Sequence, residues 1–201
     1  LQFKEKLINI MKWDYEFDVV VIGSGNGALT SALCSHDGGA KTLVIEKSTQ
    51  FGGTSATSGG GVWIPNNRYA KAKNVDDSDQ DARNYINSVS PPGKIKDELI
   101  ETYLSEGPKM VDYLHENSQV KYRNLAHYPD YFPDNPGGKA GNRSMEPEPI
   151  NGTILGDDLG RLREQHPQTA FTMGPINMNF TQVEGQLLLG ALPGWKTQFA
   201  K

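Results

Sequence analysis

The chain has 201 residues, a formal net charge of −4, 36% hydrophobic residues and 22% charged residues, which is typical of a globular protein with a packed core. Its basic residues are scattered singly, so no basic patch indicates a nucleic-acid partner. The single cysteine, Cys34, excludes an internal disulfide, and the longest apolar run near the start, Val19–Ile22, is too short to cross a bilayer, which predicts a cytoplasmic protein without a transmembrane segment.

The first residues precede the first predicted element. Position 1 is leucine and the first methionine is Met11, so we expect residues 1–14 to be an N-terminal extension outside the fold. The folded part then begins at residue 15.

Residues 15–46 have the pattern of a strand, a glycine turn, a helix and a second strand. Residues 17–22 (FDVVVI) form a β-branched run suited to a strand buried on both faces of a parallel sheet. A helix is predicted over residues 28–36, and a glycine pair ends it. Residues 42–45 (TLVI) then form a second buried strand. Two parallel strands joined by a helix make a βαβ unit, so the fold class is α/β.

A glycine motif lies between that strand and that helix. Residues 23–28 (GSGNGA) fit the G-x-G-x-x-G/A pattern, in which Gly23 permits a tight turn and Gly25 lets the backbone approach a diphosphate. The helix N-terminus faces the phosphate charge, and Glu46 at the end of the second strand is placed to accept a ribose hydroxyl. The motif therefore predicts a dinucleotide site; the alternative is a glycine turn without a ligand.

A second glycine cluster follows directly in residues 46–67 (EKSTQFGGTSATSGGGVWIPNN). Such a stretch is typical either of a flexible linker or of backbone held against a ligand, with hydroxyls as added donors. Because it starts at the carboxyl edge of the predicted sheet, we favour the ligand, and an extended cofactor favours FAD over NAD. The predicted cofactor-binding residues are Gly23, Ser24, Gly25, Asn26, Gly27, Ala28, Glu46, Lys47, Gly52, Gly53, Thr54, Ser55, Ser58, Gly59, Gly60, Gly61 and Val62.

Three helices are predicted after the glycine clusters. The first is capped by Asp77 or Ser78 and ends before the Pro-Pro-Gly at 91–93. The second covers residues 96–105, and the third begins at Pro108, which suits a first helical turn. Together they predict a helical layer inserted after the βαβ unit.

The segment at 126–150 contains five prolines and three glycines without a helix or strand period. Loops of this length are functional or disordered, and the aromatic residues here favour a functional loop. Further along, residues 180–189 could form a helix.

Three segments resemble one family of flavoproteins. FDVVVIGSGNGALTSAL, TLVIEKSTQFGGTSATSGGGVWIPNN and DYFPDNPGGKAGNRSMEPEPIN together look like the N-terminal part of bacterial 3-ketosteroid Δ1-dehydrogenases, within the fumarate reductase and succinate dehydrogenase flavoprotein superfamily. The resemblance implies a Rossmann-like FAD-binding domain with an inserted helical layer. Residues 15–201 would be its N-terminal portion, without the substrate domain and the closing FAD-binding segment.

The resemblance also implies an activity and a catalytic candidate. Family members remove two hydrogens from the A ring of a 3-ketosteroid, with the hydride going to flavin N5 and the proton to a tyrosine base. A second tyrosine from the proline-rich loop supports that base, and the matching residue is Tyr131. Phe132 stands where the family often has another tyrosine. The alternative is that Tyr131 is a loop aromatic that only covers the core.

The base itself and the residues that hold the steroid carbonyl lie downstream in the family. The chain is therefore predicted to be a fragment with little or no turnover and with weak FAD binding. The remaining hypotheses are a fumarate reductase-like oxidoreductase with another substrate and a non-catalytic nucleotide-binding remnant. The electron acceptor is left open.

The other polar candidates are given structural roles. The four histidines have no metal-ligand spacing and are expected on the surface, so no metal is predicted; they are His36, His115, His127 and His166. Cys34 is expected to be a buried, inert thiol. Glu146 and Glu148 are expected to be solvated loop charges.

Overall fold

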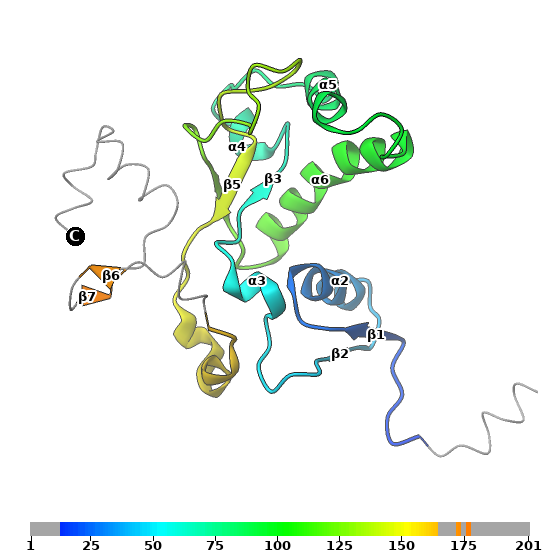
Figure 1. Cartoon of the computed structure of the whole chain (residues 1–201). Helices are drawn as coiled ribbons and strands as arrows, with labels where there is room; N and C mark the ends of the chain where they lie inside the picture. The colour runs from blue at the N-terminus through cyan, green and yellow to red at the C-terminus, as the bar shows by residue number, and fades with distance from the viewer. Residues whose placement is uncertain (1–12, 165–171, 174–175, 178–201) are drawn as a thin grey trace, which may run out of the picture. The chain divides into compact units, whose positions relative to one another are not determined.

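The computed structural model describes residues 13–164, 172–173 and 176–177 (Figure 1). The helix predicted at 180–189, His166 and most of the expected N-terminal extension lie outside these residues. The elements in chain order are β1 (Val19–Ile22), α2 (Asn26–Asp37), β2 (Thr42–Ile45), α3 (Gly53–Thr57), β3 (Val62–Trp63), α4 (Arg68–Lys71), α5 (Asp79–Val89), α6 (Asp97–Asn117), β4 (Tyr122–Asn124), β5 (Ser144–Pro147), the 3₁₀ segment η1 (Gly152–Arg161), β6 (Thr172–Met173) and β7 (Ile176–Asn177).

The chain divides into two compact units. The first comprises Leu1–Thr54 and Arg161–Arg163, and the second comprises Ser55–Gly160 and Glu164–Lys201. The boundary falls inside the second glycine cluster, so the predicted cofactor-binding residues are shared between the units.

The first unit contains the predicted βαβ unit. Strands β1 and β2 are parallel, with Val19 opposite Thr42 and Ile22 opposite Ile45, and α2 connects them and packs on both. The helix begins two residues earlier than predicted because Gly25 is already in an extended conformation and acts as its N-cap. The strand–turn–helix order required by the glycine motif is therefore present.

Burial in this unit differs from the prediction. Residues alternate between half-buried and exposed along β1, and Ile22 is 82% exposed. The expectation of a strand buried on both faces is wrong for the described residues, because α2 packs on one face of a two-stranded sheet and leaves the other open. Cys34 on α2 is exposed, so its expected burial is also wrong.

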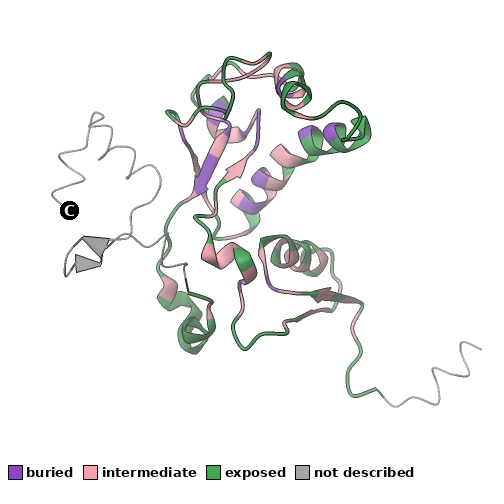
Figure 2. Ribbon diagram, viewed as in Figure 1, coloured by how far each residue is buried: buried purple, intermediate pink, exposed green. Residues whose placement is uncertain are grey.

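The second unit contains the hydrophobic core of the described residues. Its sheet has the order β3-β5-β4 and is antiparallel throughout, and the buried residues gather on β5, α5 and α6 (Figure 2). The buried hydrophobic residues are Ile64, Ala70, Ala82, Tyr85, Ile100, Leu104, Val111, Leu114, Tyr122, Leu125 and Met145.

Two of the predicted helices are one. Residues 97–117 form the single helix α6 with Pro108 inside it. A proline in a helix interior costs about 3 kcal/mol, because it removes a backbone hydrogen bond. The buried residues Leu104 and Val111 stand on either side of the proline, so packing of a continuous apolar stripe offsets that cost.

Part of the proline-rich segment is a strand rather than a loop. β5 lies between β3 and β4 and pairs Glu146 with Arg123 across the strands. The Arg123 Nε donates to Glu146 Oε1 at 2.9 Å, and the Glu146 side chain is buried. The expectation that Glu146 is a solvated charge is therefore wrong, because the strand pairing brings it an arginine; Glu148 is exposed as expected.

The longest helix of the described residues is too polar to cross a membrane. α6 has 21 residues with charged side chains along its length. Within the described ranges, none of the helices combines the length and the hydropathy that crossing a bilayer requires.

Candidate functional site

Ser24 links the two glycine turns of the first unit. Its buried hydroxyl donates to Glu46 Oε2 at 2.6 Å and accepts the N–H of Gly52 at 2.9 Å. One side chain therefore connects the turn after β1, the carboxylate after β2 and the start of the second glycine cluster.

Glu46 is held in one orientation by hydrogen bonds. Its second oxygen, Oε1, accepts the N–H of Ser48 at 3.0 Å. The hydrogen bond from Ser24, with the one from Ser48, lowers the pKa of Glu46 below its ordinary value. A carboxylate has about four lone-pair positions, so Glu46 can accept further hydroxyl groups while both bonds persist.

The turn before α2 suits an anion. Gly23 adopts a backbone angle φ of +97°, which residues other than glycine rarely adopt. Its N–H donates to the Ile45 carbonyl at 2.7 Å. At the helix start, no side chain of the described residues caps the N-terminus, and the first turn contains no acidic residue. The first-turn N–H groups carry the positive end of the helix dipole.

The two turns also approach each other through bare backbone. A Cβ on Gly53 would lie 3.4 Å from the Cα of Gly25. The structure thus brings together Ser24, Gly25, Glu46, Gly52 and Gly53 in the first unit. Lys47 and Thr54 belong to the same unit and are exposed.

The later members of the predicted cofactor site lie in the second unit. The Ser58 hydroxyl donates to the Ser55 carbonyl and accepts the Gly60 N–H at 3.1 Å, which closes a local turn. A Cβ on Gly60 would come within 2.8 Å of Pro147 Cγ. Packing against β5 is therefore one reason for a glycine here, and the predicted contact of Gly60 with FAD stays a prediction. The other members in this unit are Gly59, Gly61 and Val62.

Tyr131 is a surface residue of the second unit. Its side chain is 82% exposed, so the alternative that it covers the core is wrong. Hydrogen bonding with the Tyr128 hydroxyl raises the pKa of Tyr131 above its ordinary value. Its phenol therefore stays protonated at neutral pH and can donate a hydrogen bond.

Arg143, Asp77 and Asp130 form an ionic cluster that sequence reasoning missed. The Arg143 side chain is 1% exposed, and both carboxylates are buried beside it. The sequence indicates Asp77 only as one of two possible caps of a helix, and in the structure Ser78 caps α5. No local pattern marks such pairs, because their partners are separated in the sequence.

The described histidines differ in their surroundings. His36 and His127 are exposed as expected. His115 is half-buried instead, and its Nδ1 lies 2.8 Å from the Tyr69 hydroxyl. The Tyr69 hydroxyl also accepts the Tyr122 N–H at 2.9 Å, so it links His115 to β4.

Comparison with known proteins agrees with these features. A model of the FAD binding domain family matches residues 18–189. The 3-oxosteroid 1-dehydrogenase of Mycobacterium tuberculosis (strain ATCC 25618 / H37Rv) is 40% identical over 164 residues, which cover 81% of this chain and 28% of that protein. The 4-oxocyclohexanecarboxylate 2-dehydrogenase of Sinomonas cyclohexanicum is 39% identical over 158 residues, which cover 78% of this chain and 27% of that protein.

A solved structure is also similar. The 3-ketosteroid Δ1-dehydrogenase from Sterolibacterium denitrificans, crystallised in complex with 1,4-androstadiene-3,17-dione, has a TM-score of 0.81 and 40% identity, covering 90% of this chain and 31% of that one. The chain thus spans less than a third of the length of these relatives.

The resemblance found in the sequence is therefore confirmed, and the mixed helix and sheet arrangement is the fold of this flavoprotein family. Because the family model matches most of the chain, this protein belongs to the FAD binding domain family, whose cofactor is FAD.

Proposed function

We propose that the chain is the N-terminal portion of an FAD-dependent dehydrogenase that introduces a double bond beside the ketone of a 3-oxosteroid. The observation that carries the proposal is the link through Ser24, which joins both glycine turns to Glu46 in one unit. The relatives named above support the steroid as substrate class. The proposed fold is a Rossmann-like FAD-binding domain in which α5 and α6 belong to an inserted helical layer.

The residues of the first unit fit FAD. Residues 23–28 would hold the diphosphate through first-turn N–H groups and the helix dipole, and Glu46 would accept a ribose hydroxyl. Gly52 and Gly53 leave room for the backbone to run beside the cofactor. The residues of the second unit proposed to take part are Ser55, Ser58, Gly59, Gly60, Gly61 and Val62.

When bound, FAD supplies the hydride acceptor for the reaction. Tyr131 is proposed to support the proton transfer. Its raised pKa keeps the phenol protonated, so it would donate a hydrogen bond to the base and stabilise negative charge there. The base itself is not assigned among the described residues.

A second substrate class is supported by a specific observation. The Sinomonas relative is named for a monocyclic oxo acid and has nearly the same identity as the steroid enzymes. Loading the complete protein, of which this chain is proposed to be the N-terminal portion, with FAD and adding a 3-oxosteroid or 4-oxocyclohexanecarboxylate without oxygen compares the two classes, with bleaching of the flavin spectrum as the readout. Bleaching by neither compound would contradict both dehydrogenase proposals, while bound FAD without bleaching would favour a nucleotide-binding remnant.

Ser24→Ala is expected to weaken FAD binding about tenfold, because it leaves the Gly52 N–H without its acceptor and releases Glu46. Fluorescence titration of the apoprotein with FAD measures the change. Ser48→Ala is the control, since this hydroxyl only accepts the Gln50 N–H and the Ser48 backbone bond to Glu46 remains. Equal weakening in both variants would show that the Ser24 link does not organise the cofactor site.

In the complete protein, Tyr131→Phe is expected to lower the rate of steroid-dependent flavin reduction about tenfold or more, because it removes the donor proposed to support the base. FAD affinity should stay unchanged. Tyr15→Phe is a matched control, as Tyr15 is 80% exposed and belongs to the other unit. Stopped-flow absorbance of the flavin gives the rate, and an unchanged rate in Tyr131→Phe would remove this residue from the mechanism.

A further inference from the structure

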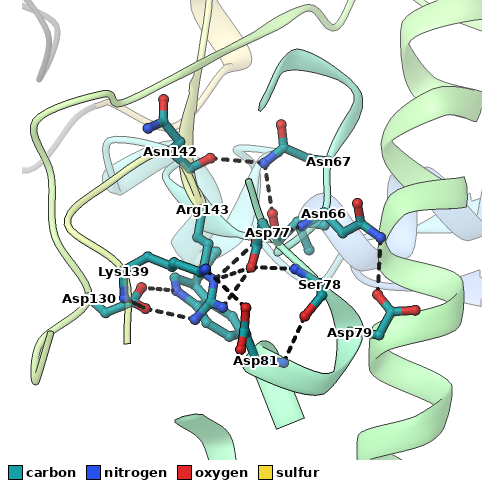
Figure 3. A network of polar contacts seen from close by, with 12 residues as sticks. Asn66, Asn67, Asp77, Ser78, Asp79, Asp81, Asp130, Lys139, Asn142 and Arg143 are labelled. Carbon is teal, nitrogen blue, oxygen red and sulfur yellow. Dashed lines mark hydrogen bonds and ion pairs between the residues drawn. The ribbon is translucent and has the colours of Figure 1, made fainter. Parts of the chain in front are cut away.

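A buried ionic cluster of Arg143, Asp77 and Asp130 includes the residue that directly precedes Tyr131 (Figure 3). The Arg143 guanidinium donates through Nη1 to Asp130 Oδ2 at 2.8 Å and through Nη2 to Asp77 Oδ1 at 2.7 Å. Its Nε also lies 3.1 Å from Asp77 Oδ2. One arginine therefore holds two carboxylates that are far apart in the sequence.

Each carboxylate is tied to a different part of the unit. Asp77 accepts the N–H of Asn66 at 3.0 Å and that of Ser78 at 2.9 Å, which fixes the chain between β3 and α5. Asp130 accepts the Trp63 Nε1–H at 2.6 Å and the Lys139 N–H at 3.0 Å. The cluster thus fastens the proline-rich loop to β3 and to the start of α5.

Aromatic rings enclose the guanidinium. It lies 5.5 Å from the Trp63 ring centre and 5.8 Å from that of Tyr85, and cation–π attraction is stronger when water is excluded. The Tyr85 hydroxyl also accepts the Phe132 N–H at 3.2 Å. The same ring therefore touches the cluster and the residue after Tyr131.

The two neighbours of Tyr131 are therefore fixed while its own side chain is exposed. Asp130 is held by Arg143 and Trp63, and Phe132 is held by Tyr85. Two hydrogen bonds between Asp130 and Lys139 close the loop: the Asp130 N–H donates to the Lys139 carbonyl at 2.9 Å, and the Lys139 N–H donates to the Asp130 carboxylate at 3.0 Å. An exposed side chain on a backbone held at both adjacent residues is suited to position a hydroxyl for a ligand.

We propose that Arg143 is a positioning residue for Tyr131, holding the loop through Asp130 while anchored to the core by Asp77. This inference rests on the proposed function of Tyr131 and extends it to residues that touch no substrate. Buried ion pairs often contribute little net stability, and fixing one conformation is a known use of them. Arginine is required because its planar fork reaches both carboxylates, which the single ammonium of lysine does not.

The test compares Arg143→Lys with Arg123→Lys in the 201-residue chain. Arg123 is a matched control because it also pairs with a buried carboxylate, that of Glu146, across strands β4 and β5. Amide hydrogen exchange at Phe132 and Lys139 reports on the loop. A ¹³C-tyrosine NMR titration, assigned with Tyr131→Phe, reports on the Tyr131 phenol.

In Arg143→Lys we expect these two amides to exchange at least about tenfold faster. We also expect the pKa of Tyr131 to move toward its ordinary value as the loop loosens and the bond to Tyr128 is lost. Arg123→Lys should change neither. Equal changes in both variants, or no change in Arg143→Lys, would overturn the proposal.

If circular dichroism shows that Arg143→Lys does not fold, the variant Trp63→Phe tests the proposal in its place. It removes the hydrogen bond from the Trp63 Nε1–H to Asp130 and keeps an aromatic ring. The same faster exchange and the same pKa change are expected there, and their absence would overturn the proposal. None of these readouts uses steroid or flavin, so a failed dehydrogenase assay leaves the result on Arg143 intact. Conversely, a freely moving loop in an active protein would overturn only the positioning role.

Discussion

Asp77→Asn is expected to lower the free energy of unfolding by about 3–5 kcal/mol, the cost of breaking a buried ion pair by removing one partner. The Asp77 carboxylate accepts two hydrogen bonds from the nearly fully buried Arg143 and two from the backbone. In the variant, an amide NH₂ replaces one of the two acceptor oxygens, and it must face either a guanidinium donor or a backbone N–H. Urea denaturation followed by circular dichroism measures the change.

The remaining partner does not remove this cost. Asp130 still neutralises Arg143 through Nη1, but Nε and Nη2 lose their ionic acceptor in a buried site, where an unpaired donor costs most. The matched control is Asp112→Asn, since Asp112 is 51% exposed and pairs with Arg68 at 3.3 Å. That surface pair should contribute less than about 1 kcal/mol. Similar losses in both variants would mean that water reaches the Arg143 cluster.

The parts of the fold that the sequence predicted correctly depend on neighbouring residues. The β-branched run, the glycine turn and the helix start lie within about twenty residues, and each is set by local sterics. The Ser78 cap is of the same kind, because its hydroxyl accepts the N–H of Asp81 three residues later. Such signals need no knowledge of the rest of the molecule.

The errors depend on contacts between distant segments. Pro108 looks like a helix start by itself, and only the packing of α6 shows why the helix continues through it. Glu146 looks solvated until β5 pairs with β4 and brings Arg123 to it. A single sequence without the fold contains none of these distances.

The candidate site shows the same contrast between local sequence signals and contacts of distant segments. The motif identified Gly23, Gly25 and Glu46, but the role of Ser24 as the link between them depends on a partner 28 residues away, Gly52. Likewise, Tyr131 was found through resemblance, while Arg143, which binds the neighbouring Asp130, could not be found from spacing.

Gly137→Ala is expected to destabilise the second unit by about 3–5 kcal/mol, the sum of backbone strain and overpacking. Gly137 adopts φ +77°, and a Cβ there would lie 2.0 Å from the Asp81 carbonyl oxygen on α5. Backbone cannot move aside as a flexible side chain could, so the loop must lift from the helix. Gly93→Ala is the control, because Gly93 has φ +70° but nothing within 4 Å of the added Cβ.

The control separates the two causes. Gly93→Ala should cost only the strain, about 1–2 kcal/mol, so the difference between the variants in urea denaturation measures the overlap with α5. A second readout locates the damage: the hydrogen bond from Lys139 Nζ at 3.0 Å lowers the pKa of Asp81. When alanine lifts the loop, this bond is lost and the pKa of Asp81 should rise toward its ordinary value, which NMR titration detects. Equal losses of unfolding free energy in both variants, with an unchanged pKa of Asp81, would mean that the loop does not rest on α5. The loop that carries Tyr131 would then lack one of its proposed supports.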